Sequence, residues 1–183
     1  MLVVHPTDKT TDFLKCLYAD KDIIRILDQR YSNSQINSAL FHSSMYEQIM
    51  LLGHGSDKGL FSKSDDSKDG FDRIIIGHSH GYLLRRHNGH IVGIWCNADK
   101  FAQKERLHGL FSGMIVTEMT EADEYNIVTS QEELDIENNK LAERLKAILD
   151  SGLSLYEVSR EIVGLDDVHS PLTTFNYNNF FYL

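Results

Sequence analysis

The chain has 183 residues, of which 42% are hydrophobic and 25% are charged, a composition typical of one soluble folded domain. It contains only two cysteines, Cys16 and Cys96, which excludes a disulfide framework and indicates a reducing, cytoplasmic compartment. The net charge of −9 disfavours nucleic acid as a partner. We expect no signal peptide at residues 1–10, which lack a basic segment, and we expect no membrane span, because no apolar run is long enough to cross a bilayer.

Short apolar runs alternate with stretches of helical periodicity through the first two-thirds of the chain. The apolar runs predict strands at residues 2–5, 23–27, 48–53, 74–76, 91–95 and 114–117. The periodic stretches predict helices after Thr10 or Thr11, after the cap Ser32, at residues 82–86 and at about 100–107. Residues 56–72 are polar, and we interpret them as a functional loop or a disordered tip.

The last third of the chain is predicted to be mainly helical. Apolar residues at helical spacing predict a helix from about Gln131 to Ser151, and a capping box at 154–157 predicts a second helix that ends near Val163. The aromatic tail at 175–183 predicts an edge strand that could form a homodimer contact.

The order of these elements predicts an α/β fold, a three-layer sandwich with a mainly parallel central sheet. We expect a single domain over residues 1–183. Its core is expected at 1–125, and its C-terminal helices and edge strand at 126–183.

Two reactive side chains directly follow two of the predicted strands. His54 and Gly55 come after the run at 48–53, and Cys96 comes after the run at 91–95. If the two strands are neighbours in a parallel sheet, imidazole and thiol face one crevice. A cysteine nucleophile needs an imidazole that takes its proton and later protonates the leaving amine. Gly55 permits close approach of a substrate backbone, and backbone N–H groups near Gly55 and Cys96 could form an oxyanion hole.

Two sequence strings carry a family resemblance: Leu51–Gly55 (LLGHG) and Ile91–Asp99 (IVGIWCNAD). They resemble the His-Gly and Cys motifs of the caspase-like cysteine peptidases, which include caspases, gingipains, clostripain, separase and the CHAT proteins. Cys96 follows His54 after about 40 residues, compared with about 50 in caspases. The segment Gly109–Asp123 is similar to a CHAT segment in which a helix leads into a strand and then an acidic turn.

The resemblance covers roughly residues 1–125 and implies a caspase-like sandwich. It implies that Cys96 is the nucleophile and that His54 is the general base and acid of a peptidase. The substrate would be a polypeptide, and we expect no cofactor.

Residues 118–138 contain eight acidic side chains and no Lys or Arg. If this stretch lines the substrate pocket, Glu118, Glu121 or Asp123 would select Arg or Lys before the scissile bond. The alternative interpretation is a solvated surface with acidic residues placed favourably before a helix N-terminus.

A non-catalytic binding module on the same fold is one alternative function. It is favoured by Trp95, because the family usually has a small residue directly before the cysteine. A serine hydrolase is another alternative, because residues 77–81 (GHSHG) match the G-x-S-x-G nucleophile elbow. Ser79 would then be the nucleophile, with His169 and either Asp166 or Asp167 as its partners.

Four histidines lie close together in the sequence, at positions 78, 80, 87 and 90. The string Gly-His-Ser-His resembles a metal-binding segment of binuclear metallophosphoesterases. The chain has no Gly-Asp motif, which that family needs, and first-row metals require three or four ligands in fixed geometry. We therefore expect no metal and interpret the histidines as a surface loop near an active site.

Overall fold

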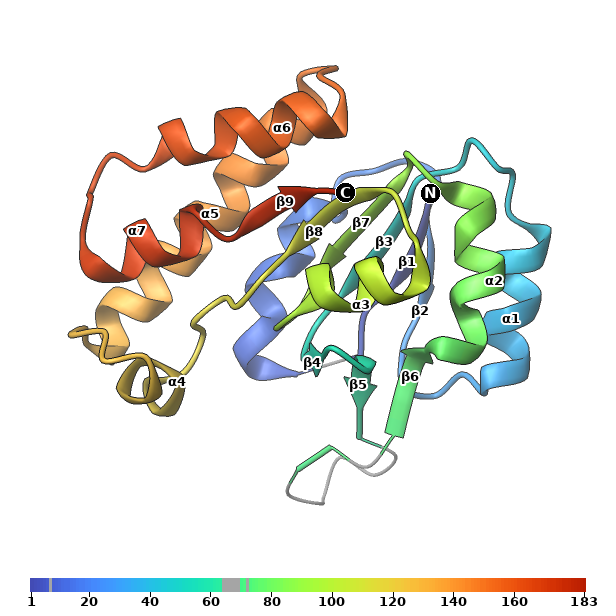
Figure 1. The fold of residues 1–183 in the computed structure, drawn as a ribbon, viewed down its shortest axis with the longest axis horizontal. Coiled ribbons are helices and arrows are strands. Elements are labelled where there is room, and N and C mark those ends of the chain that lie inside the picture. Colours follow the sequence, from blue (N-terminus) through green and yellow to red (C-terminus); the bar gives the residue numbers. More distant parts are fainter. Residues whose placement is uncertain (7, 64–69, 72) are drawn as a thin grey trace.

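The structure is a computed structural model that describes residues 1–6, 8–63, 70–71 and 73–183 (Figure 1). The strands of the main sheet are β1 (Leu2–Val4), β2 (Arg25–Leu27), β3 (Ile49–Leu52), β7 (Ile91–Ile94), β8 (Gly109–Ser112) and β9 (Phe180–Tyr182). A second sheet contains β4 (Gly55–Ser56), β5 (Gly59–Ser62) and β6 (Arg73–Gly77).

The α-helices are α1 (Asn33–His42), α2 (Gly81–Leu84), α3 (Ala98–Glu105), α4 (Met119–Glu124), α5 (Gln131–Asp150), α6 (Leu155–Glu161) and α7 (Pro171–Tyr177). The 3-10 helices are η1 (Lys9–Leu17), η2 (His78–His80), η3 (Arg85–His87) and η4 (Ile162–Leu165). In the part of the chain that the structure describes, no helix combines the length and the apolar character needed to cross a membrane.

The main sheet has six strands in the order β2-β1-β3-β7-β8-β9. All neighbouring pairs from β2 to β8 are parallel, and β9 is antiparallel to β8. The prediction of an α/β fold with a mainly parallel sheet is therefore confirmed. Strand β9 lies at the edge of the sheet, as the sequence predicts, and Phe181 and Tyr182 of this strand are each 39% exposed.

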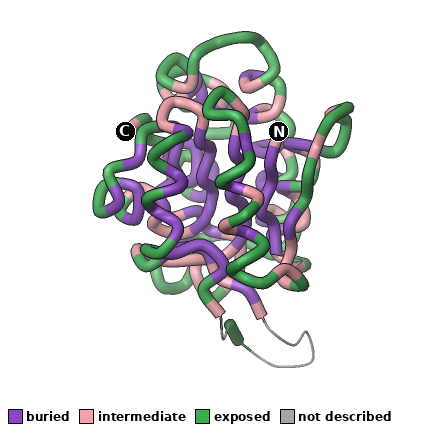
Figure 2. The backbone as a smooth tube through the Cα atoms, turned by 90° about the vertical axis from the view of Figure 1, so that its right-hand side faces the viewer, coloured by how far each residue is buried: buried purple, intermediate pink, exposed green. Residues whose placement is uncertain are grey.

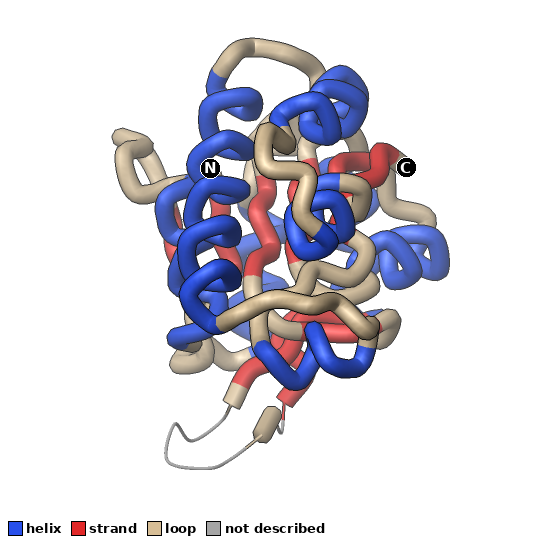
Figure 3. Tube along the Cα trace, turned by 90° about the vertical axis from the view of Figure 1, so that its left-hand side faces the viewer, coloured by secondary structure: helices blue, strands red, loops and turns tan. Residues whose placement is uncertain are grey.

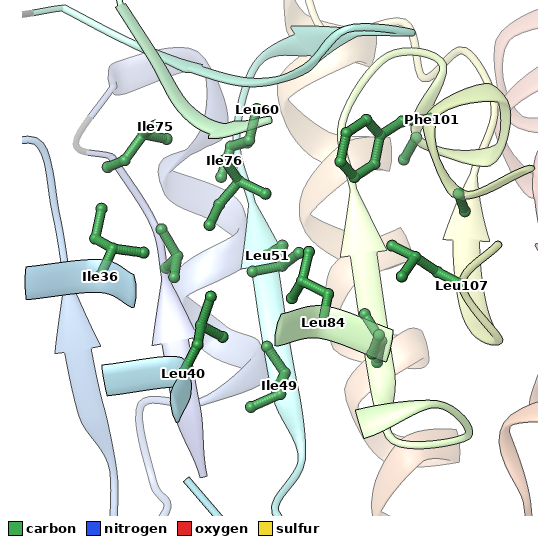
Figure 4. Close-up of a cluster of buried hydrophobic side chains, with 14 of the residues drawn as sticks. Ile36, Leu40, Ile49, Leu51, Leu60, Ile75, Ile76, Leu84, Phe101 and Leu107 are labelled. Carbon is green, nitrogen blue, oxygen red and sulfur yellow. The ribbon is translucent and has the colours of Figure 1, made fainter. Parts of the chain in front are cut away.

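Helices cover both faces of the main sheet, and successive strand residues pack on opposite faces. On one face, Leu51 belongs to a buried cluster that includes Leu40 of α1 and Leu84 of α2 (Figure 4). On the other face, Met50 belongs to a cluster that includes Leu14 of η1 and Leu145 of α5. The four central strands, β1, β3, β7 and β8, are buried throughout their length (Figure 2), and Figure 3 shows strands of the sheet lying among helices. This double burial explains why the run at 48–53 is apolar throughout.

Local capping determines where several helices begin. Ser32 accepts a hydrogen bond from the Gln35 N–H at the start of α1, and Ser154 accepts one from the Glu157 N–H at the start of α6. Each pair forms a complete capping box, which satisfies backbone donors that a helix start would otherwise leave unpaired. The predicted starts of these two helices are confirmed.

The prediction of a fifth strand at residues 114–117 is wrong. The strand is β8, whose residues Gly109 to Phe111 pair with β7, and the chain leaves the sheet at Gly113. Ile115 and Val116 are nevertheless buried, at 4% and 0% exposure. The segment 114–117 is buried but does not pair with another strand, and a buried segment of this kind has the same apolar pattern as a strand.

Two further predictions are wrong in part. The segment at 56–72 is not only a loop, because β5 lies within it, while residues 64–69 and 72 lie outside the described residues. The tail at 175–183 begins as the last turn of α7, and only residues 180–182 form a strand. The acidic stretch from residue 118 contains α4, which the sequence pattern does not predict.

A buried histidine follows β1 and should make stability depend on pH. His5 is 3% exposed, its Nδ1 atom lies 3.0 Å from the Tyr18 hydroxyl, and burial lowers its pKa from 6.5 to about 4. Between pH 6.5 and pH 4 the unfolded chain therefore binds more protons at this residue than the folded chain. We expect His5 to reduce the free energy of unfolding by up to about 3 kcal/mol as the pH falls through this window.

Urea unfolding at both ends of this pH window, for the wild type and His5→Phe, measures the effect. The phenylalanine variant should show a smaller loss of stability on acidification. An equal loss in both proteins would exclude His5 as its source.

Candidate functional site

The carboxyl ends of neighbouring parallel strands meet at one edge of the main sheet. Asp8 follows β1, His54 follows β3, Cys96 follows β7, and the segment after β8 leads to Glu121 in α4. The strand order β1-β3-β7-β8 brings these four positions to the same edge, next to one another. The small sheet and α4 lie at this edge (Figure 1).

The His54 ring is held by two polar groups that follow β1. Its Nε2 atom lies 2.6 Å from Thr10 Oγ1 and 3.3 Å from Asp8 Oδ1. The Thr10 hydroxyl donates its proton to Asp8 Oδ1 at 2.7 Å, so it accepts from a protonated Nε2. This tautomer leaves Nδ1 unprotonated and able to act as a base.

The Asp8 carboxylate stays charged beside the ring. Partial burial acts to raise the pKa of Asp8, but hydrogen bonds from Thr10 and the neighbouring His54 lower it overall. Neither Asp8 nor Thr10 was predicted from the sequence as a site residue. Asp8 could have been predicted from its position just after the first predicted strand. That strand, β1, is the parallel neighbour of β3, and His54 follows β3.

Cys96 lies on a sharp turn between β7 and α3. The next residue, Asn97, has a left-handed backbone with φ of 66°, and its N–H donates to the Gly113 carbonyl. The Cys96 thiol donates to the Ile115 carbonyl and to Glu121 Oε1, each at 3.7 Å. Burial, followed by the Glu121 carboxylate, raises the pKa of Cys96 to about 12, so the thiol is protonated at neutral pH.

His54 and Cys96 line one small cavity together with Ile115 and Thr117. Its volume is about 20 Å³, enough for a single water molecule. Two larger cavities, of about 580 Å³ and 590 Å³, have Thr10 in common in their linings. Thr117 lines the larger of these as well as the small cavity. The small cavity that His54 and Cys96 line therefore adjoins the cavity of about 590 Å³.

Gly55 forms the start of a hairpin and lies against Trp95. Because the His54 carbonyl accepts from the Phe61 N–H, the Gly55–Leu60 pair is the non-hydrogen-bonded pair of the β4–β5 ladder. The Gly55 N–H therefore points away from β5. A Cβ atom at Gly55 would overlap the Trp95 indole, so this position requires glycine.

The three acidic residues that the sequence analysis selected have different surroundings. Glu121 faces Cys96. Glu118 lines the cavity of about 580 Å³ together with Asp8 and two lysines. Asp123 is exposed on α4 and lines none of the three cavities at this edge.

Ser79 lies in η2, after a strand of the small antiparallel sheet. Its Oγ atom is 3.3 Å from His80 Nδ1, a nitrogen that also accepts from the Gly77 N–H at 3.1 Å. The backbone at Ser79 is not in the left-handed region, whereas a nucleophile elbow is a strained turn. The His169 ring instead contacts Asp166, with 3.6 Å between His169 Nδ1 and Asp166 Oδ2. The structure thus shows no contact between Ser79 and its predicted partners.

The four clustered histidines have separate partners. The His78 ring contacts Glu105, the His80 ring accepts from Gly77, the His87 ring contacts the Leu40 carbonyl, and the His90 ring packs against Tyr46. Within the described ranges, no group of three or more His, Cys, Asp or Glu side chains is arranged to hold a metal ion.

The sequence matches no protein-family model, and no curated protein is significantly similar to it.

Proposed function

We propose that the protein is a caspase-like cysteine endopeptidase in which Cys96 is the nucleophile and His54 is the general base and acid. The observation that carries this proposal is that both side chains follow neighbouring parallel strands, β3 and β7, and line the same cavity. The mainly parallel sheet with helices on both faces agrees with a caspase-like sandwich. The sequence resemblance at LLGHG and IVGIWCNAD supports the same assignment.

In the proposed reaction, Cys96 gives its thiol proton to His54 Nδ1 while Sγ attacks the carbonyl carbon of the scissile bond. The carbonyl electron pair moves to oxygen, where the N–H groups of Gly55 and Cys96 would stabilise the negative charge. Collapse of this intermediate breaks the C–N bond, and His54 transfers its proton to the leaving amine. Water, deprotonated by His54, then hydrolyses the thioester and restores the thiol.

Asp8 and Thr10 would orient the ring during these steps. Their contacts with Nε2 keep Nδ1 free of a proton in the resting state. The Asp8 carboxylate would also stabilise the positive ring that forms when His54 takes up the thiol proton. Both residues act through His54 and are positioning residues.

For the residue before the scissile bond, we propose Lys or Arg. Glu118 is the acidic side chain best placed for this selection, because it lines the large cavity beside the His54 site together with Asp8.

The test is hydrolysis of fluorogenic peptides that differ only in the residue before the reporter group. We expect cleavage after Arg or Lys. If only peptides with Asp before the reporter group are cleaved, the proposal that Glu118 selects Arg or Lys is wrong. Hydrolysis that Ser79→Ala loses and Cys96→Ala retains would instead establish the serine hydrolase.

A non-catalytic binding module is the second candidate function. It is favoured by the small volume of the cavity that Cys96 shares with His54, and by the burial and the Glu121 contact that raise the pKa of the thiol. A binding module would cleave none of the peptides, and its partner would bind equally well to Cys96→Ala.

A further inference from the structure

One segment covers the thiol of Cys96, and we call residues 113–124 the strap. It begins where β8 ends and includes α4. Buried amides hold its first part in place: the Val116 N–H donates to Asn176, and the Val116 carbonyl accepts from both Asn176 and Asn138. The strap is therefore anchored to α5 and α7 on one side and contacts Cys96 on the other.

Both hydrogen-bond acceptors of the Cys96 thiol belong to the strap. They are the Ile115 carbonyl and Glu121 Oε1. The Ile115 carbonyl cannot take up the thiol proton, and in the proposed reaction that proton goes to His54 rather than to Glu121. A carboxylate beside the sulfur also disfavours the thiolate, because two negative charges would then lie close together in a buried site.

Glu121 is held in this orientation by its second oxygen. Oε2 accepts from the Thr117 N–H at 2.7 Å, from the Glu118 N–H at 3.2 Å and from the Thr117 hydroxyl at 3.2 Å. These three donors fix the carboxylate and leave Oε1 directed at the thiol. The same strap narrows the space around Cys96, since Ile115 and Thr117 line the cavity of about 20 Å³.

We propose that the strap is an inhibitory latch, in which Ile115 and Glu121 hold the Cys96 thiol away from His54 until the strap moves. The inference rests on the proposed function, in which Cys96 is the nucleophile. It assigns Glu121 to control of the nucleophile rather than to substrate selection. Displacement of the strap would free the thiol and enlarge the cavity that Cys96 shares with His54.

The latch is tested by the rate at which iodoacetamide alkylates Cys96, in a Cys16→Ala background so that only one thiol reacts. Glu121→Gln removes the charge but keeps an oxygen that can accept from Thr117 and Glu118. Because thiolate is the reactive form, each unit by which the pKa falls increases the rate about tenfold at neutral pH. We expect alkylation of this variant to be at least about tenfold faster than in the Cys16→Ala parent.

The matched control is Glu124→Gln, which makes the same charge change at an exposed position of the same helix. Its alkylation rate should equal that of the parent. An unchanged rate in Glu121→Gln would overturn the latch, and so would an equal acceleration in both variants. Thr117→Val, which keeps the Glu121 charge but loses one of its donors, should give a smaller acceleration and provides a second test if Glu121→Gln fails to fold.

Alkylation requires no substrate, so this test is separate from the test of the proposed function. If Glu121→Gln is alkylated faster but neither it nor the wild type cleaves any peptide, the latch stands and the peptidase proposal fails. If peptides are cleaved but the alkylation rates are equal, the peptidase proposal stands and the latch fails.

Discussion

Replacing Cys96 with alanine should reduce kcat/KM for peptide hydrolysis by about a thousandfold or more. The variant has no sulfur atom to form the thioester. The Thr10 hydroxyl also contacts the His54 ring, but it donates its proton to Asp8 Oδ1. The measurement is steady-state hydrolysis of the best peptide reporter. It should be made in the wild-type background and in the Glu121→Gln background, where the thiol is expected to be released.

The matched control is Cys16→Ala. Cys16 is the second thiol of the chain, and it packs beside the cluster formed by η1 and α5 rather than in the His54 cavity. Its loss should leave hydrolysis within about twofold of the wild type. Peptide hydrolysis that survives in purified Cys96→Ala would exclude Cys96 as the nucleophile.

The two central residues of the candidate site could be predicted because each follows an apolar strand directly. For His54 and Cys96, knowing that the strands are parallel is enough to place both side chains at the same edge. Asp8 and Thr10 were not found because their role depends on β1 being the neighbour of β3, and strand order cannot be read from apolar runs. The contact between Glu121 and Cys96 depends on the path of the chain after β8, which local sequence does not determine.

The position of β8 shows why one strand was misplaced. Both halves of the segment 109–117 are apolar, so periodicity alone cannot choose between them. The choice depends on a non-local fit, because β8 pairs Phe111 with Gly93 of β7. A Cβ atom at Gly93 would come within 2.7 Å of the Phe111 ring, so the missing side chain makes room for it. This complementarity fixes the register and leaves 114–117 outside the sheet.

Trp95 stands where the caspase-like peptidases, which the sequence resembles, usually have a small residue, and in this structure it has a specific structural role. It is 1% exposed, and its indole N–H donates to the Ser56 carbonyl at 3.0 Å. The ring also packs against Phe101, with centroids 5.6 Å apart. The indole thus connects the end of β7 to the hairpin that starts directly after His54, and it occupies the space that the absent side chain of Gly55 leaves.

Trp95→Ala should therefore reduce the free energy of unfolding by about 3–5 kcal/mol, the usual cost of a large buried cavity. The lost hydrogen bond accounts for about 1 kcal/mol of this, because the Ser56 carbonyl loses its indole donor. The matched variant Trp95→Phe keeps an aromatic ring but lacks the N–H, so its loss of stability should be clearly smaller. Chemical denaturation followed by circular dichroism measures both, since Trp95 is the only tryptophan and its fluorescence disappears in either variant.

The same pair of variants separates a structural role from an effect on the site. If the indole positions the hairpin after His54, Trp95→Ala should lower kcat/KM for peptide hydrolysis at a temperature where the variant is still folded, and Trp95→Phe should retain more activity. If Trp95→Ala lowers the free energy of unfolding by less than about 1 kcal/mol, the hairpin is held in place by other contacts. In that case the departure from the family pattern at this position would have no structural reason.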